Sequence, residues 1–108
     1  MKTSYYSAVI EEAKDAAKEA FNNYEPSNPL VCGFAFAKIK LDARTTDGKS
    51  LIAEGFKSDY CGRYAFSFYD MVPEASTQSI EHREVAVNAF VKVLNDYGMN
   101  AYTWSRLD

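Results

Sequence analysis

The residues best suited to chemistry stand in a short polar and aromatic stretch, residues 57–64, which reads Lys-Ser-Asp-Tyr-Cys-Gly-Arg-Tyr. It brings cations, hydroxyl groups and rings together, and loops carry binding residues more often than scaffolds do. Tyr60, Arg63 and Tyr64 are therefore candidate contacts for a ligand or a protein partner. The alternative interpretation of this stretch is a solvated connection between two elements.

A second candidate pair is formed by Trp104 and Arg106, which are two positions apart. Side chains two apart on a strand share a face, so an indole and a guanidinium placed this way can sandwich a base or grip a phosphate. The structural alternative puts Trp104 in the core and pairs Arg106 with an acid such as Asp108. The sequence leaves both interpretations open.

Gln78 and Ser79 stand where a long helical pattern begins. The free N–H groups at a helix start attract anions, so both residues are included among the candidate contacts. Ser79 also has the side chain of a simple N-cap.

Residues for catalysis or metal binding are few. His82 is the only histidine, and a position one turn into a helix disfavours its charged form, which favours a surface or capping role over a catalytic base. Cys32, Cys61 and His82 lack the spacing of a zinc site, and no phosphate loop or nucleophile elbow is present. We expect a protein that is not an enzyme and has no catalytic residues, no metal and no cofactor.

Two long helices are predicted to support these groups. Residues 4–24 are rich in Ala and repeat apolar side chains at three- and four-residue steps, and residues 80–97 do the same. Ser79 is the expected N-cap of the second helix, and Gly98 stands where a left-handed C-cap belongs. A short helix is predicted over residues 50–56.

Three segments alternate rings with small residues, which is the pattern of strands. They cover residues 31–42, residues from 63 to no later than Pro73, and residues 100–107. Their large side chains fall on even positions: Phe34, Phe36, Tyr64, Phe66, Phe68, Tyr102 and Trp104. The segments therefore predict a sheet with a ring-rich face.

The order helix, strand, short helix, strand, helix, strand predicts a single α+β domain over residues 1–108. We expect a two-layer sandwich, with a three-stranded mixed or antiparallel sheet packed against two main helices. The second and third strands flank a helix, so they are expected to run parallel as a crossover unit. The first strand can pair antiparallel to either of them.

Either face of this sheet can form the core. The rings can interdigitate with the Ala-rich helix, or the small face can pack on the helices and leave the rings outside. The combined apolar area of these rings exceeds the few hundred Å² that soluble monomers usually expose in one patch. We therefore expect the ring-rich face to be covered. The cover is expected to be the protein's own helices, a second copy in a homodimer, or a bound partner.

Net charge and the distribution of apolar residues limit the partners and the cellular location that we expect for this protein. A net charge of −3 argues against a broadly basic nucleic-acid surface, and no apolar run is long enough to span a membrane. The charged first twenty residues do not resemble a signal peptide. We expect a cytoplasmic protein with reduced cysteines and no membrane contact.

The strand Cys32-Gly33-Phe34-Ala35-Phe36 and the closing Ala-Tyr-x-x-Ser-Arg-x-Asp of residues 101–108 resemble those of a group of small uncharacterised bacteriophage proteins. A Gln-Ser pair before the last helix is shared as well, and the likeness extends over residues 31–108. The resemblance implies a viral protein of the host cytoplasm that disables a host system by binding.

The leading hypothesis is thus a non-enzymatic phage-type binding protein that inhibits a host defence component or sequesters a small nucleotide signal. Its partners would be a host protein or a nucleotide ligand, with a homodimer as a further expectation. The alternative is a single-stranded nucleic-acid binder that uses the rings as stacking platforms, although the acidic charge balance argues against it.

Overall fold

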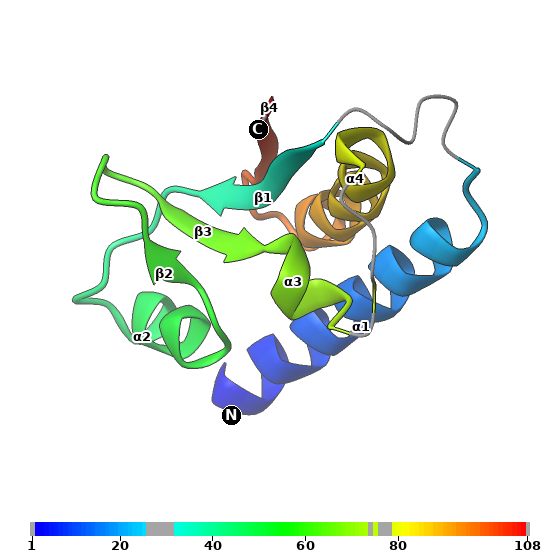
Figure 1. The fold of residues 1–108 in the computed structure, drawn as a ribbon. Helices are drawn as coiled ribbons and strands as arrows, with labels where there is room; N and C mark the ends of the chain where they lie inside the picture. Colours follow the sequence, from blue (N-terminus) through cyan, green and yellow to red (C-terminus); the bar gives the residue numbers. More distant parts are fainter. Residues whose placement is uncertain (1, 26–31, 74, 76–78, 108) are drawn as a thin grey trace.

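The computed structural model describes residues 2–25, 32–73, 75 and 79–107, and it is an α+β fold (Figure 1). The fold predicted from the sequence is confirmed in its class and in the order of its main elements. In chain order the elements are α1 (Lys2–Asn22), β1 (Gly33–Ile39), α2 (Thr46–Ala53), β2 (Lys57–Ser58), β3 (Tyr64–Ser67), α3 (Phe68–Met71), α4 (Ile80–Asp96) and β4 (Tyr102–Leu107).

Local capping chemistry sets the bounds of α4. The Ser79 hydroxyl accepts a hydrogen bond from the His82 N–H at 3.3 Å, which satisfies one of the free donors at the start of the helix. After the helix, Gly98 has a φ of 87°, a left-handed conformation that glycine adopts without steric cost. Both of these predicted caps are confirmed.

The sheet has four strands in the order β2-β3-β1-β4, and every neighbouring pair is antiparallel. β3 and β4 therefore run in the same direction with β1 between them. This confirms the predicted crossover, with β1 antiparallel to both strands. β1 and β2 are related in the same way around β3, so the elements after α1 follow the split βαβ arrangement.

The strand after Gly62 is shorter than predicted. Ser67 has an extended backbone, and its hydroxyl accepts a hydrogen bond from the Tyr69 N–H at 3.1 Å. This cap turns the chain into α3, so Phe68 is a helical residue and not part of β3. The two-residue strand β2, which pairs with β3, is an element that the sequence did not predict.

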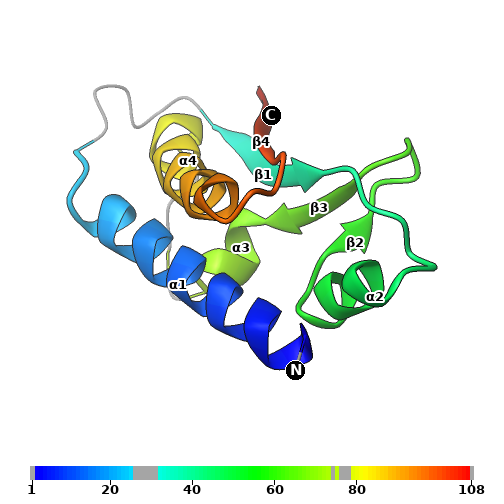
Figure 2. The same cartoon turned by 180° about the vertical axis from the view of Figure 1, so that it is seen from behind.

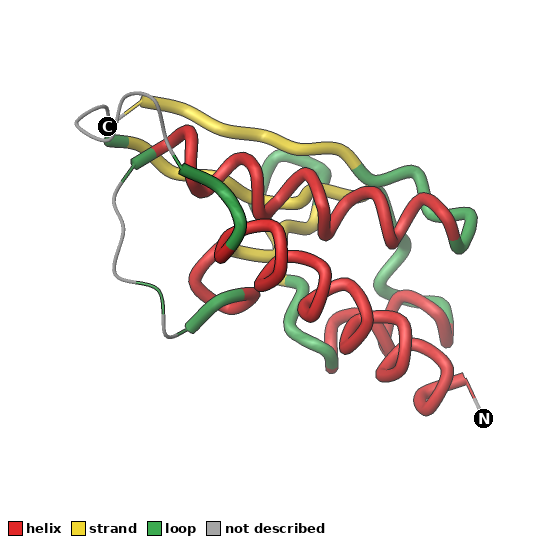
Figure 3. Tube along the Cα trace, turned by 90° about the vertical axis from the view of Figure 1, so that its right-hand side faces the viewer, coloured by secondary structure: helices red, strands yellow, loops and turns green. Residues whose placement is uncertain are grey.

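The helices cover one face of the sheet and leave the other open (Figures 2 and 3). On β1 the small residues Ala35 and Ala37 are buried against the helices, whereas Phe34 and Phe36 are only partly covered. The small face of β1 is therefore the core face. The alternative that the β1 rings interdigitate with the Ala-rich helix is therefore wrong.

The expectation of one ring face shared by all three strands is also wrong. Phe66 lies opposite Ala37, and Tyr64 lies opposite Ile39, and facing residues in an antiparallel pair point to the same side. The β3 rings therefore belong to the core face. The open face carries only the rings of β1 and β4.

Phe66 and Phe90 form the centre of the core. Their rings stack at 4.9 Å between centroids, and both side chains are almost completely buried. Ala13 and Ala17 of α1 and Ala86 of α4 are buried as well, and such small side chains allow the two helices to approach closely. Burial of each large apolar side chain contributes about 1.5–3 kcal/mol.

The end of α1 is clasped to the first turn of α4. The Tyr24 hydroxyl donates to the Glu81 carboxylate at 2.5 Å, and this hydrogen bond raises the pKa of Tyr24. His82 stacks on Phe21 at 3.7 Å between ring centroids, and its Nε2 is hydrogen-bonded to the Phe21 carbonyl at 2.7 Å. His82 therefore caps the last turn of α1.

Candidate functional site

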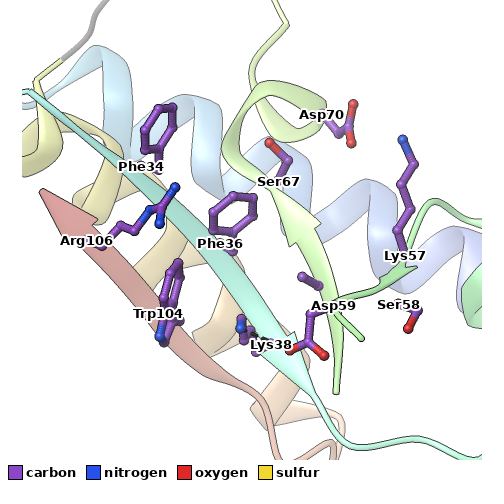
Figure 4. A pocket seen from close by; sticks show the side chains of 11 residues that line it. Phe34, Phe36, Lys38, Lys57, Ser58, Asp59, Ser67, Asp70, Trp104 and Arg106 are labelled. Atoms are coloured by element: carbon purple, nitrogen blue, oxygen red, sulfur yellow. Dashed lines mark hydrogen bonds and ion pairs between the residues drawn. The ribbon is translucent and has the colours of Figure 1, made fainter. Parts of the chain in front are cut away.

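A groove of about 490 Å³ lies on the open face of the sheet. It has side chains from β1, β2, β3 and β4 and from the short helix α3 (Figure 4). Its volume is within the range of roughly 300–1,000 Å³ that is typical of small-molecule sites. The groove is therefore the candidate functional site.

One wall of the groove is a row of rings and cations on β1 and β4. Trp104 lies opposite Phe36, with ring centroids 5.8 Å apart, and Arg106 lies opposite Phe34, with its guanidinium carbon 5.6 Å from the ring centroid. Lys38 extends over Trp104, with its Nζ 4.4 Å from the ring centroid. These cross-strand contacts hold the aromatic rings in fixed positions.

The floor of the groove is formed by β3, which contributes small side chains on this face. Ala65 lies opposite Lys38, and Ser67 lies opposite Phe36. Because a small residue takes the place of a ring at each position, space is left beside Phe36. A flat group of about the size of an aromatic ring can therefore lie against that side chain.

The wall facing the rings carries polar groups. Lys57 of β2 and Asp70 of α3 both line the groove and are exposed to solvent. Figure 4 shows them across the groove from the Trp104 and Arg106 side chains. A ligand in the groove thus meets an aromatic surface on one side and charges on the other.

Asp59 fixes the end of the groove next to Lys38. Its carboxylate accepts hydrogen bonds from the Cys61 N–H at 2.8 Å, from Lys38 Nζ at 3.0 Å and from the Arg63 N–H at 3.0 Å. These donors, the Cys61 N–H first, lower the pKa of Asp59 to about 2. Asp59 therefore binds both Lys38 and the backbone of the β2–β3 hairpin.

Arg106 has a different environment. Its side chain is exposed, and within the residues that the structure describes no carboxylate forms an ion pair with it. Its guanidinium lies beside the Phe34 ring, which presents it to the groove. Arg106 therefore retains free donors for an anionic group of a ligand.

A buried arginine supports Phe34 from the core side. Arg83 of α4 is only 3% exposed and donates to the Gly33 carbonyl at 2.6 Å and to the Tyr69 hydroxyl at 2.6 Å. Its guanidinium carbon is 5.9 Å from the Phe34 ring centroid. Both guanidinium carbons thus lie within about 6 Å of the Phe34 ring centroid, and Arg83 is tied to the start of β1 through the Gly33 carbonyl.

The structure brings only some of the predicted site residues together. Trp104 and Arg106 line the groove. Tyr60 is 94% exposed at the tip of the β2–β3 hairpin, where it has a φ of 61°. Arg63 Nη1 donates to the carbonyl of Gly62 in the same hairpin, so neither of these two residues lines the groove.

The remaining predicted site residues lie elsewhere. Tyr64 packs against the core from the opposite face of the sheet. Ser79 is 1% exposed and caps α4, so its hydroxyl is committed to the helix. Gln78 lies outside the described residues.

Sequence reasoning missed Lys57, Ala65, Ser67 and Asp70 as groove residues. The alternation of residues 64–68 does put Ala65 and Ser67 on the face opposite to Phe66. The sequence does not show which face of β3 lies on the same side of the sheet as Phe34 and Phe36 of β1. The register between the two strands supplies this information. Lys57 lies in the predicted polar stretch of residues 57–64 but was not among its candidate contacts, and Asp70 left no signal in the sequence, because a four-residue helix positions it.

No group of three or more His, Cys, Asp or Glu side chains in the described part of the chain is arranged to hold a metal ion. Among the helices described, none is long and apolar enough to cross a membrane. No protein-family model, curated protein or solved structure matches this chain. The resemblance to bacteriophage proteins therefore stays a prediction.

Proposed function

We propose that this protein is a non-enzymatic binding protein whose groove captures a small nucleotide and thereby sequesters a nucleotide signal. The observation that carries the proposal is the combination of exposed rings and an uncommitted guanidinium along one wall of a groove of ligand size. A base would lie against Phe36 beside Trp104, and a phosphate would meet Arg106. Stacking on aromatic side chains contributes about 1–3 kcal/mol per base.

The proposal of a binding protein without catalysis draws support from the ion pair at one end of the groove. Asp59 accepts three hydrogen bonds, and Lys38 is its ion-pair partner. A carboxylate with a pKa of about 2 is a weak general base near neutral pH. Asp59 and Lys38 thus hold the end of the groove in shape.

The biological setting of the proposal comes from the resemblance to bacteriophage proteins. A cytoplasmic phage protein that removes a nucleotide signal would inhibit a host defence system that depends on that signal. Direct inhibition of a host protein is the other form of this proposal, and it would use the exposed hairpin tip at Tyr60.

The test is a titration of the purified protein with mono-, di- and cyclic nucleotides, followed by the fluorescence of its only tryptophan, Trp104. We expect a saturable change for at least one nucleotide. Ala65→Phe fills the floor of the groove and should weaken binding about tenfold or more. Ala8→Phe, on an exposed position of α1, is the matched control and should bind as the unmodified protein does.

Arg106→Gln distinguishes the contribution of the phosphate to binding from that of the base. Because it removes only the cation, it should weaken binding of a nucleoside monophosphate and leave binding of the nucleoside unchanged. A protein that gives no saturable signal with any nucleotide contradicts the proposal. Equal binding by Ala65→Phe contradicts the groove as the binding site.

A second candidate function is binding of single-stranded nucleic acid. It is favoured by an antiparallel four-stranded sheet with one open face and with rings on two adjacent strands, an arrangement that RNA-binding sheets use to stack bases. Tyr102 extends the row of rings beyond the groove and is 42% exposed.

A labelled oligonucleotide distinguishes the two functions. Strand binding should fall steeply with rising salt and should weaken in Tyr102→Ala, a variant that leaves the groove lining intact. Captured mononucleotides should be insensitive to that variant. Absence of oligonucleotide binding at low salt removes the second candidate.

A further inference from the structure

β4 forms one edge of the sheet and pairs only with β1 among the described strands. It is six residues long, and its sequence Tyr-Thr-Trp-Ser-Arg-Leu contains no proline and no glycine. Arg106 is its only charge. Soluble proteins usually protect such an edge with a short strand, charges, proline or a bulge, and β4 has only the single charge.

The opposite edge of the sheet is protected. β2 has two residues and carries Lys57, so it offers little backbone for another strand to pair with. The two edges therefore differ in the length of backbone that they offer to another strand, two residues at β2 and six at β4. The β4 edge is therefore available for pairing with another strand.

We propose that the occupant of this edge is β4 of a second copy of the chain, paired antiparallel around a two-fold axis at Trp104. Facing residues in an antiparallel pair point to the same side of the sheet. The register then places complementary residues opposite each other in the two copies: Ala101 with Leu107, Tyr102 with Arg106, Thr103 with Ser105, and Trp104 with Trp104.

The single charge on β4, Arg106, supports this register. Arg106 of each copy lies opposite the ring of Tyr102 of the partner subunit, a favourable cation–ring pair. A shift that brings Arg106 opposite Arg106 of the partner subunit juxtaposes like charges, which is unfavourable on a sheet. The sequence of β4 is thus complementary to itself in the proposed register.

The exposure of β4 side chains supports a partner as well. Leu107 is 65% exposed, Tyr102 is 42% exposed and Trp104 is 36% exposed, which is a large amount of apolar surface for one edge strand. Pairing of the two copies joins their sheets into one and makes their open faces continuous.

The decisive experiment changes Tyr102 in two opposite ways and measures the dimer dissociation constant by light scattering and analytical ultracentrifugation. Tyr102→Arg places like charges opposite each other and should weaken the dimer about tenfold, whereas Tyr102→Glu creates an ion pair with Arg106 of the partner subunit and should tighten it about tenfold. Tyr102 is exposed, so circular dichroism should show that both variants remain folded.

A cysteine pair tests the register. In a Cys61→Ser background, Tyr102→Cys and Arg106→Cys proteins should each form no disulfide-linked dimer alone, and an equimolar mixture of the two should form one under mild oxidation. Cys32 is present in every sample, so its own cross-links appear in the single-variant controls. A cross-link that appears only in the mixture supports the register.

A chain that stays monomeric at high concentration overturns the proposal. It is also overturned by a dimer whose dissociation constant is the same in Tyr102→Arg and Tyr102→Glu, or by a mixture without a specific cross-link. The proposal does not rest on nucleotide capture, because its readouts are mass and cross-linking in the absence of nucleotide.

Discussion

Asp59 is the residue on which the β2–β3 hairpin depends most. One carboxylate oxygen accepts from two backbone N–H groups, and the other accepts from Lys38 of β1. The hairpin contains Tyr60 and Gly62 in left-handed conformations, which cost free energy for a residue with a side chain. The carboxylate offsets this cost by binding the backbone of the turn.

Asp59→Asn should lower the melting temperature at neutral pH, because it removes the charge that these donors favour. Since the pKa of Asp59 falls from 3.8 to about 2 on folding, the carboxylate stabilises the fold above pH 4, and its contribution is lost as the pH falls from about 4 to about 2. The difference in melting temperature should shrink over that range, as measured by thermal unfolding at a series of pH values.

Asp96→Asn is the control for this prediction. It removes an ion pair with Lys92 in which both side chains are largely exposed, and such pairs contribute about 0–1 kcal/mol. A difference between Asp59→Asn and the unmodified protein that is constant from pH 7 to pH 2 would contradict the role of the carboxylate charge.

Residue roles that depend on near neighbours were predictable from the sequence. Ser79 and Gly98 were identified as caps because cap chemistry lies within a few positions of the helix end. The role of Asp59 was not, because its partner Lys38 is 21 positions away. Arg83 was missed for the same reason, since it reaches the Gly33 carbonyl 50 positions away.

Among the elements, the connection between α4 and β4 is held by a single side chain. The Asn95 amide accepts from the Ala101 N–H at 2.8 Å and donates to the Ala101 carbonyl at 3.0 Å. With Gly98 in the left-handed conformation, this pair of hydrogen bonds turns the chain from the helix into the edge strand. Asn95 thus determines where β4 begins.

Asn95→Ala should destabilise the protein by about 1–2 kcal/mol, because it leaves two backbone groups of Ala101 without their partner. Denaturant unfolding measures this loss, and hydrogen exchange at the Ala101 N–H should become faster. Asn88→Ala is the matched control on the same helix, because Asn88 bonds only the Thr103 hydroxyl, which water can solvate. Equal losses in the two variants would contradict the special role of Asn95.

Element positions were predictable where periodicity runs long. α1 and α4 were placed to within about two residues, since each repeats its apolar side chains over several turns. The end of β3 was not, because Phe68 continues the alternation and only the Ser67 cap ends the strand. The groove residue Asp70 was not predicted, because a four-residue helix holds it, and the strand β2 that holds Lys57 was not predicted either.

At the scale of the whole molecule, the sequence could not decide which sheet face is the core. Alternation separates two faces within each strand, but only the register between strands shows which faces coincide. Phe66 lies opposite Ala37, so a ring and a small residue share the core face. The open face has rings on β1 and β4 and small residues on β3.

Two ring deletions test this assignment. Phe66→Ala should cost about 3–5 kcal/mol, because a fully buried ring is replaced by a cavity, which is a large part of the stability of about 5–15 kcal/mol typical of domains. Trp104→Ala removes a larger ring from the open face and should cost clearly less, because that ring is 36% exposed and leaves no closed cavity. Denaturant unfolding of both variants gives the comparison, and similar losses would contradict the assignment.

The clasp between α1 and α4 has a consequence for the order in which the chain becomes folded during synthesis. The His82 contact with Phe21 spans 61 positions, and β1 receives its β4 neighbour only when residue 107 has been made. Until then, the edge of β1 that pairs with β4 emerges from the ribosome without its partner, and the apolar side of α1 lacks α4 until that helix has been made. The N-terminal part of the chain therefore completes its packing only after α4 and β4 have been synthesised.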